Sequence, residues 1–385
     1  MSHLSNPDRR YYPGAVRVGE TCLRLLLVSC LLTQISCTAI DEAVDSNIEK
    51  TRDASTVTYN SSTLRVMTLN MWNVSVFGFS LSPDIHVRTG ALIKHLAQNE
   101  LEIDIVLLQE MWDKSARVEL LEGDVVKERF PFRFDAQGTF GRSGLVVLSR
   151  YPILDDKFWF LQFSRGGDWW KFYQGDRLAG KGVVAFKIEF ENHPVWIMNT
   201  HLIACYDSSN KIECDQYDSN GRYRWDQINQ LRGFVNDLSG PLPALVAGDF
   251  NFTLTSRYSQ AIQNPSSRSA LQRADDFQNS TTGYSSDRAW NPTPEIFRPE
   301  GRIDFIWMRD GDNSNWGVAE PMVEVFSEPV SVSESIFTKL SDHPALMAGF
   351  CLLGSKTDTS CDRDVSNVAP LEVSVPVTNA MLLAY

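Results

Sequence analysis

From residue 64 onward, short apolar runs alternate with polar turns along most of the chain. The runs are LRVMTLNMW (64–72), IDIVLLQE (103–110), GLVVLSR (144–150), KGVVAFKIEF (181–190), VWIMNTHL (195–202), ALVAGDFN (244–251), RIDFIWM (302–308) and PALMAGF (344–350). Short runs that are apolar at consecutive positions are typical of strands covered on both faces. The pattern therefore predicts a buried β-sheet core.

Two segments between these runs have helical spacing instead. Their apolar positions, each set on one face, are Ala91, Leu92 and Leu96 in residues 87–98, and Trp225, Ile228, Leu231 and Val235 in residues 224–238. Strands interspersed with helices indicate an α/β protein. We expect these elements to form one large domain over residues 63–352, and no repeat recurs at a fixed period.

The first 39 residues have a different pattern. Four arginines precede the apolar run LLLVSCLLTQI (25–35), which is too short to span a bilayer, since spanning takes about 20 residues. A basic flank, a short apolar region and the small residues of SCTA predict a secretory signal, with cleavage after Ala39. The alternatives are a lipoprotein signal, with lipid on Cys30 or Cys37, and an uncleaved anchor. We therefore expect a secreted protein or a membrane-anchored lipoprotein.

Polar residues 40–62 indicate a linker, and residues 353–385 form a C-terminal tail in which LEVSVPV is either a strand or a loose end. Four cysteines follow the signal, namely Cys205, Cys214, Cys351 and Cys361. An even number in an exported chain favours disulfides over free thiols. Three connectivities are possible, and the local spacing favours Cys205–Cys214 and Cys351–Cys361.

Composition narrows the class of ligand. The chain is 43% hydrophobic and 22% charged, with a formal net charge of -12 and a pI near 5.0. It therefore has ample material for a core but no overall basic field with which to hold a nucleic-acid backbone. A bound metal ion could reverse the sign of the charge locally.

Polar side chains collect at the ends of the predicted strands. They are Asn70, Glu110, His201, Asp249, Asn251 and Asp304, with Asp342 and His343 just before the last strand. Each alone has a plainer interpretation, as a buried amide, an ion pair or a turn residue. Ligands gather at one end of the strands in α/β sheets, so these groups predict one shared pocket. The other histidines, at positions 3, 86, 95 and 193, are expected to be structural or on the surface.

The order of TLN, QE, GDFN and SDH along the chain resembles the endonuclease/exonuclease/phosphatase superfamily of metal-dependent phosphodiesterases. The resemblance runs from Leu64 to about Phe350. It implies a deoxyribonuclease-like, four-layer sandwich of two central mixed β-sheets flanked by helices. It also implies a Mg²⁺-dependent hydrolase, with Mn²⁺ or Co²⁺ as substitutes.

The resemblance assigns the metal ligands. Glu110 is expected to be the main one, with Asn70 beside it. Asp249 and Asn251 would complete the pocket around the phosphate and the nucleophile, or bind a second ion. Asp342 would bind or position metal. Carboxylate and amide oxygens are the ligands that Mg²⁺ prefers, which agrees with this assignment.

The resemblance also assigns proton and charge transfer. His343 would be the general base that takes a proton from water, since imidazole titrates near neutral pH. Asp304 would hold His343 in one tautomer. His201 would donate a hydrogen bond to a phosphoryl oxygen.

One segment, YQGDRLAGKGVVAF (173–186), is similar to neutral sphingomyelinases, which carry an Asp five residues before a Lys-Gly pair. Asp176 and Lys181 match and are expected to bind substrate. The implied reaction cleaves a membrane phospholipid, sphingomyelin, to ceramide and phosphocholine. No adjacent aromatic pair lies between residues 309 and 341, where secreted bacterial members insert a membrane-binding hairpin, so membrane engagement stays open. The alternatives are an exported nuclease, which the acidic composition disfavours, and a non-catalytic binding module.

Overall fold

A computed structural model of the chain describes residues 62–76, 78–138, 141–164, 180–204, 220–253, 256–263, 272–273, 303–309, 311, 316–333 and 337–352. These residues all fall within one compact unit, Ala43–Tyr385. The expected signal, the tail, and the residues Asp176, Cys205, Cys214 and Cys361 lie outside the described residues, so the predictions made for them stay predictions. Cys351 is disulfide-bonded.

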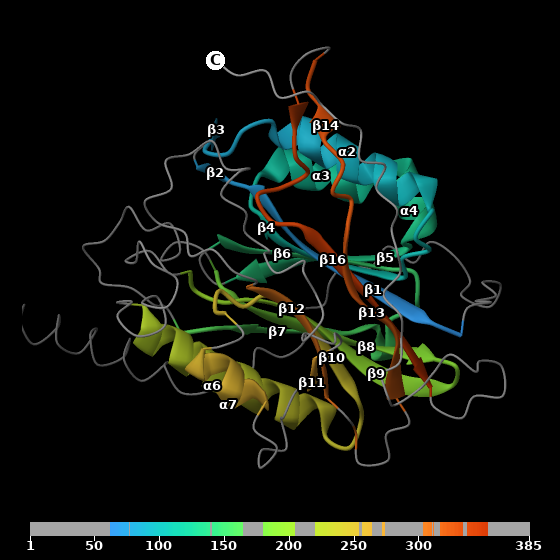
Figure 1. The fold of residues 1–385 in the computed structure, drawn as a ribbon, viewed down its shortest axis with the longest axis vertical. Coiled ribbons are helices and arrows are strands. Elements are labelled where there is room, and N and C mark those ends of the chain that lie inside the picture. Colours follow the sequence, from blue (N-terminus) through green and yellow to red (C-terminus); the bar gives the residue numbers. More distant parts are fainter. Residues whose placement is uncertain are drawn as a thin grey trace, which may run out of the picture. The chain divides into compact units, whose positions relative to one another are not determined.

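Two six-stranded sheets form the centre of the fold (Figure 1). In order, the first contains β13 (Trp316–Val325), β16 (Ala345–Leu352), β1 (Leu64–Asn73), β4 (Ile105–Met111), β6 (Gly141–Ser149) and β5 (Phe132–Gly138). The second contains β11 (Gln272–Arg273), β12 (Asp304–Arg309), β10 (Ala244–Asp249), β9 (His193–His201), β8 (Gly182–Phe190) and β7 (Phe158–Gln162). Both sheets are mixed.

Helices cover the outer face of each sheet. The helices α2 (Ile85–Gln98), α3 (Lys114–Glu122) and α4 (Asp124–Arg129) pack on the first sheet, and α6 (Gly221–Ser239) and α7 (Arg257–Gln263) on the second (Figure 1). A third apolar core lies between the sheets and includes Leu107 and Phe186. The four-layer arrangement expected from the sequence is thus confirmed. Among the described helices, none is long and apolar enough to cross a membrane.

The strands that the sequence pattern missed lie mainly at sheet edges. β5, β7 and β13 are each the last strand on one side of their sheet. Edge strands tolerate polar residues, bulges and proline because one row of backbone groups needs no partner. β13 shows this most clearly, since its register with β16 shifts twice around Pro321. Uniform apolar runs identify central strands and fail at the edges.

A parallel pair lies at the middle of each sheet, β1 with β4 and β9 with β10. In parallel strands the carboxyl ends lie at the same edge. Asp249 is the register partner of His201 on one side and of Asp304 on the other. The topology therefore brings the polar strand ends together.

Candidate functional site

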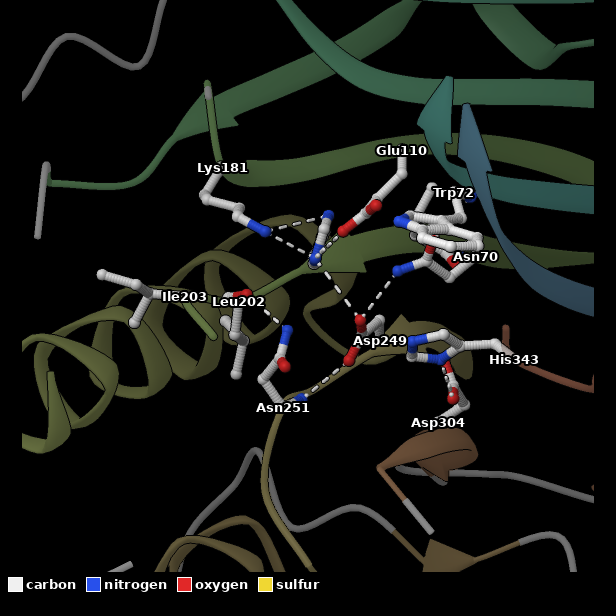
Figure 2. Close-up of polar contacts among 12 residues, drawn as sticks. Asn70, Trp72, Glu110, Lys181, Leu202, Ile203, Asp249, Asn251, Asp304 and His343 are labelled. Atoms are coloured by element: carbon white, nitrogen blue, oxygen red, sulfur yellow. Dashed lines mark hydrogen bonds and ion pairs between the residues drawn. The ribbon is translucent and has the colours of Figure 1, made fainter. Parts of the chain in front are cut away.

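The carboxyl ends of the central strands of both sheets meet at one cluster of polar side chains (Figure 2). Asn70 comes from β1 in the first sheet, and Asp249 comes from β10 in the second. The Asn70 Nδ2 atom donates a hydrogen bond of 3.0 Å to Asp249 Oδ2. The cluster therefore spans the two sheets, and strands far apart in the sequence position it.

His201 lies on one side of this cluster among charged groups. Its Nε2 atom is 3.4 Å from Asp249 Oδ2 and 3.7 Å from Glu110 Oε1. The Lys181 ammonium lies 2.6 Å from the same nitrogen and 5.5 Å from the centre of the Trp112 ring. Two carboxylates thus face a lysine and an imidazole, which offsets the charge of each group in a buried setting.

His343 lies on the other side of the cluster, where it is paired with the Asp304 carboxylate. Its Nδ1 atom is 2.7 Å from Asp304 Oδ2, and both residues are buried. A carboxylate at Nδ1 favours the tautomer that carries its proton there, which leaves Nε2 as the basic nitrogen. The geometry suits a proton acceptor at Nε2.

Asp249 is held in its charged form. Burial alone would raise its pKa, but the hydrogen bond to His201 and the positive charges of His201, His343 and Lys181 outweigh it, so the pKa lies below the usual range. The Asp249 Oδ1 atom also accepts from the backbone nitrogen of Asn251 at 2.9 Å. An ionised, oriented carboxylate therefore stands at the centre of the site.

The backbone of the site adopts unusual conformations. Trp72, Glu110 and Asn251 have φ values of 50°, 55° and 52°, which cost free energy in residues other than glycine. Gly248 has a φ of 145°, and a Cβ there would lie 1.9 Å from the Thr200 carbonyl oxygen. Only glycine fits at that position, which explains the Gly of GDFN.

Two sets of side chains could hold a metal ion. Glu110, His201 and Asp249 form one set, and Asp249, Asp304 and His343 the other, with the ligand atoms of each set within 4.8 Å of one another. Glu110 is the most accessible of the first set, with 18% of its side chain exposed. The cluster is therefore in contact with solvent at Glu110.

The structure places most of the predicted site residues in this network. They are Asn70, Glu110, Lys181, His201, Asp249, Asn251, Asp304 and His343. Asp342 is buried, but its carboxylate accepts from Ser341 Oγ at 3.3 Å and joins neither candidate metal set. Two histidines predicted to be structural lie in other contacts, His86 with Glu119 and His95 stacked on Phe326.

Several residues that hold the strands around the site in place were not predicted from the sequence. Gln109, one residue before Glu110 in the first sheet, donates to Asn199 Oδ1, two residues before His201 in the second sheet, at 2.7 Å. Buried Arg88 donates to the backbone oxygens of Met71, Trp72 and Leu340, and so ties β1 to the segment before His343. In the sequence, only their positions could have indicated Gln109 and Asn199, since both lie within two residues of predicted site residues.

A comparison with known families agrees with this geometry. The sequence profile of the Endonuclease/Exonuclease/phosphatase family matches residues 67–343, a span that begins in β1 and ends at His343. The chain belongs to this family. The resemblance predicted from the sequence motifs is confirmed.

Two curated relatives are named as sphingomyelin-cleaving proteins. A Drosophila melanogaster protein, provisionally named a neutral sphingomyelinase, is 30% identical over 289 residues, 74% of this chain and 60% of the fly protein. Sphingomyelin phosphodiesterase 5 of Danio rerio is 28% identical over 175 residues, 39% of this chain and 28% of the fish protein. The chain thus spans 60% or less of the length of these relatives.

Solved structures share the fold at lower identity. SmcL has a TM-score of 0.55 at 19% identity, with 75% of this chain and 99% of that chain covered. A mutant Staphylococcus aureus beta toxin with bound magnesium ions has a TM-score of 0.52 at 17% identity, covering 74% and 98%. D. rerio TDP2 complexed with a single-strand DNA product has a TM-score of 0.52 at 14% identity, with 75% of this chain and 99% of that chain covered. These neighbours support the fold alone.

Proposed function

We propose that this protein is a metal-dependent phosphodiesterase that hydrolyses sphingomyelin, or a related phospholipid, to ceramide and phosphocholine. The observation that carries the proposal is the meeting of the Asp304–His343 pair with the carboxylates of Glu110 and Asp249 at the strand ends. The two carboxylates can hold a metal ion, and His343 can accept a proton. The names of the two curated relatives support the lipid substrate.

The donor set fits a hard divalent cation. Glu110 and Asp249 offer carboxylate oxygens. Asn70 lies beside them, with its Nδ2 donating to Asp249 and its Oδ1 accepting from the Trp72 backbone nitrogen, and it would offer that amide oxygen to the ion. Mg²⁺ prefers oxygen ligands and keeps several waters, which suits the partly exposed Glu110; Mn²⁺ and Co²⁺ would substitute. When bound, such an ion would polarise a phosphoryl oxygen and stabilise the charge that develops during attack.

His343 would take the proton of the attacking water at Nε2. Its Nδ1 nitrogen stays fixed on Asp304 during this transfer, so the imidazolium that forms is stabilised by the buried carboxylate. Asp304 therefore acts as a positioning residue for His343.

Lys181 and His201 would stabilise the phosphate charge. Both are buried, and both lie beside the carboxylates that would hold the metal. A positive group that is fixed before reaction costs no reorganisation when negative charge develops. Asp176, which lies outside the described residues, would keep Lys181 in this position.

A nuclease on the same fold is the second candidate. The shared fold with TDP2, a structure of which holds a DNA product, leaves this activity open. The net charge of -12 provides no broad electrostatic attraction to DNA, and it favours the lipid substrate.

A direct competition of substrates tests the proposal. Purified protein with Mg²⁺ would be incubated with sphingomyelin vesicles, phosphatidylcholine vesicles, and single- and double-stranded DNA, and the products would be separated. We expect phosphocholine release from sphingomyelin at a rate at least about 10-fold above any DNA cleavage. Rapid DNA cleavage with intact sphingomyelin would replace the proposal by the nuclease alternative.

A further inference from the structure

A short apolar hairpin leaves β1 directly after the site. β2 (Ser75–Val76) pairs antiparallel with β3 (Phe79–Ser80), and Gly78 at the turn has a φ of 83°. In Figure 1 the pair lies beyond the β1 end that carries the site. The hairpin begins within a few residues of Asn70, so whatever the hairpin touches is placed close to the site.

The tip of this hairpin exposes large apolar side chains. Phe79 is 74% exposed and Leu81 63%, the highest values among the large hydrophobic residues that the structure describes. A Cβ on Gly78 would meet nothing within 4 Å, so the backbone at Gly78 faces open space. Exposed aromatic and aliphatic groups on a small projection mark an interaction surface.

The base of the hairpin is anchored while its tip is not covered. Leu81 N donates to Val74 O at 2.8 Å, and Val74 N donates to Ser82 Oγ at 3.1 Å. The buried guanidinium of Arg88 bridges both ends, because it donates to Trp72 O at 3.0 Å and to Pro83 O at 2.9 Å. A two-stranded hairpin is only marginally stable by itself, so these bonds set the direction in which the tip points.

We propose that the hairpin of residues 74–82 inserts Phe79 and Leu81 into the surface of a lipid bilayer and thereby holds the site against its substrate. This inference rests on the proposed function, in which the substrate is a membrane lipid. Residues 74–83, VSVFGFSLSP, carry no charged side chain in a chain that is 22% charged. The tip therefore fits the interface of a neutral or zwitterionic bilayer, where aromatic rings are favoured.

A second copy of the chain fits the hairpin tip less well than a bilayer does. A stable protein interface buries about 1,200–2,000 Å², and two side chains at the end of a thin hairpin supply a small part of that area. The other exposed large apolar residues of the described part are Val118, Val125 and Trp225, which lie on α3, α4 and α6 instead of the hairpin. A bilayer requires only that the tip be apolar and uncharged.

Vesicle binding by a hairpin variant and a matched control tests this inference. Phe79→Ser/Leu81→Ser and Val118→Ser/Val125→Ser each remove two exposed apolar side chains. Sedimentation with zwitterionic vesicles of phosphatidylcholine and sphingomyelin would be measured in chelator, so that binding is separated from hydrolysis. We expect the hairpin variant to bind at least about 10-fold more weakly than the wild type, with the helix variant within about 2-fold. Wild-type binding between 0.05 and 0.5 M salt should change little, since the tip has no charge to screen.

Each outcome separates the hairpin from the proposed function. Equal binding by the hairpin variant and the wild type, with matching melting temperatures, overturns the hairpin inference even if sphingomyelin is hydrolysed. Hairpin-dependent binding by a protein that hydrolyses no phospholipid supports the surface and refutes the proposed function. A wild-type dimer that the hairpin variant loses in size-exclusion chromatography would assign the tip to a second copy and overturn the bilayer as occupant.

Discussion

The acidic groups near the two ends of β1 and β4 have different kinds of neighbours. Before β4, Asp104 accepts from the Arg65 backbone nitrogen at 3.0 Å and pairs with Arg150 at 2.9 Å. At the other end, Glu110 and Asp249 face each other across His201. The first end matches each acid to a guanidinium group, whereas the second brings acids close to one another.

Further charged residues complete the pattern at the first end. Arg65 also pairs with Glu320 at 2.7 Å and with Glu102 at 3.0 Å. Neither candidate metal set among the described residues includes an acid from this end. A buried acid at a strand end is therefore no sign of a reaction site by itself. What distinguishes the candidate site is an acid whose neighbours are other acids and imidazoles.

The largest expected effect contrasts the two ends of β4 directly. Glu110→Gln should lower phosphocholine release by at least about 10³-fold, because it would remove the charged oxygen of the proposed metal ligand. Asp104→Asn, at the opposite end of the same strand, should stay within about 3-fold of the wild type. Initial rates on sphingomyelin vesicles, with melting temperatures to verify folding, measure both. Similar losses of activity in the two variants would show that the two ends of β4 do not differ in their role.

The next effect lies within the site. His343→Ala should lower kcat by about 10²–10⁴-fold, the usual range for a general base. Asp304→Asn should cost less and should alter the pH profile of kcat, because the amide cannot stabilise the imidazolium. If the pH profile of kcat for Asp304→Asn has the same shape as the wild-type profile, whatever the absolute kcat, Asp304 does not position His343.

Lys181 and His201 should act as one unit. Lys181→Met and His201→Ala should each lower kcat/KM by at least about 10²-fold, and the double variant should lose less than the product of the two losses, since the side chains are in contact. Combining Lys181→Met with His343→Ala provides the reference pair, for which the losses should multiply more nearly. Fully multiplicative losses for Lys181 and His201 would show that their contact has no energetic role.

The smallest effect concerns stability at the structural end. Burial outweighs the neighbouring arginines and raises the pKa of Asp104 to about 6, above its unfolded value near 3.9. The folded state thus binds the proton more tightly, and the free energy of unfolding should fall as pH rises from about 4 to about 6, by on the order of 2 kcal/mol. Asp104→Asn should remove most of that fall. Urea unfolding of both proteins at several pH values measures this free energy. The same pH dependence in Asp104→Asn and the wild type would contradict the raised pKa of Asp104.

Much of the fold could be predicted from the sequence because the central strands are apolar on both faces. β1, β4, β9 and β10 lie near the predicted bounds. β5, β7 and β13 could not be recognised, since at a sheet edge the apolar pattern is relaxed. The hairpin of β2 and β3 was also missed, because two-residue strands have too few positions to show a period.

The site was predictable where motifs fell at the ends of central strands. Asn70, Glu110 and Asp249 converge because the parallel pairs align their carboxyl ends. The sequence could not show that the Asp342 carboxylate accepts a hydrogen bond from Ser341, since contacts between adjacent residues in a turn depend on the local backbone. It also could not reveal Arg88, whose role depends on three carbonyl groups brought together only by folding.

Binding of Mg²⁺ measured by calorimetry tests the central claim most directly, because it needs neither substrate nor membrane. The claim is that the carboxyl ends of the central strands form a metal site and that the opposite ends do not. The account predicts that wild-type protein and Asp104→Asn bind Mg²⁺ with similar affinity, while Glu110→Gln binds at least about 10-fold more weakly. Equal binding by all three, or a loss confined to Asp104→Asn, would contradict it.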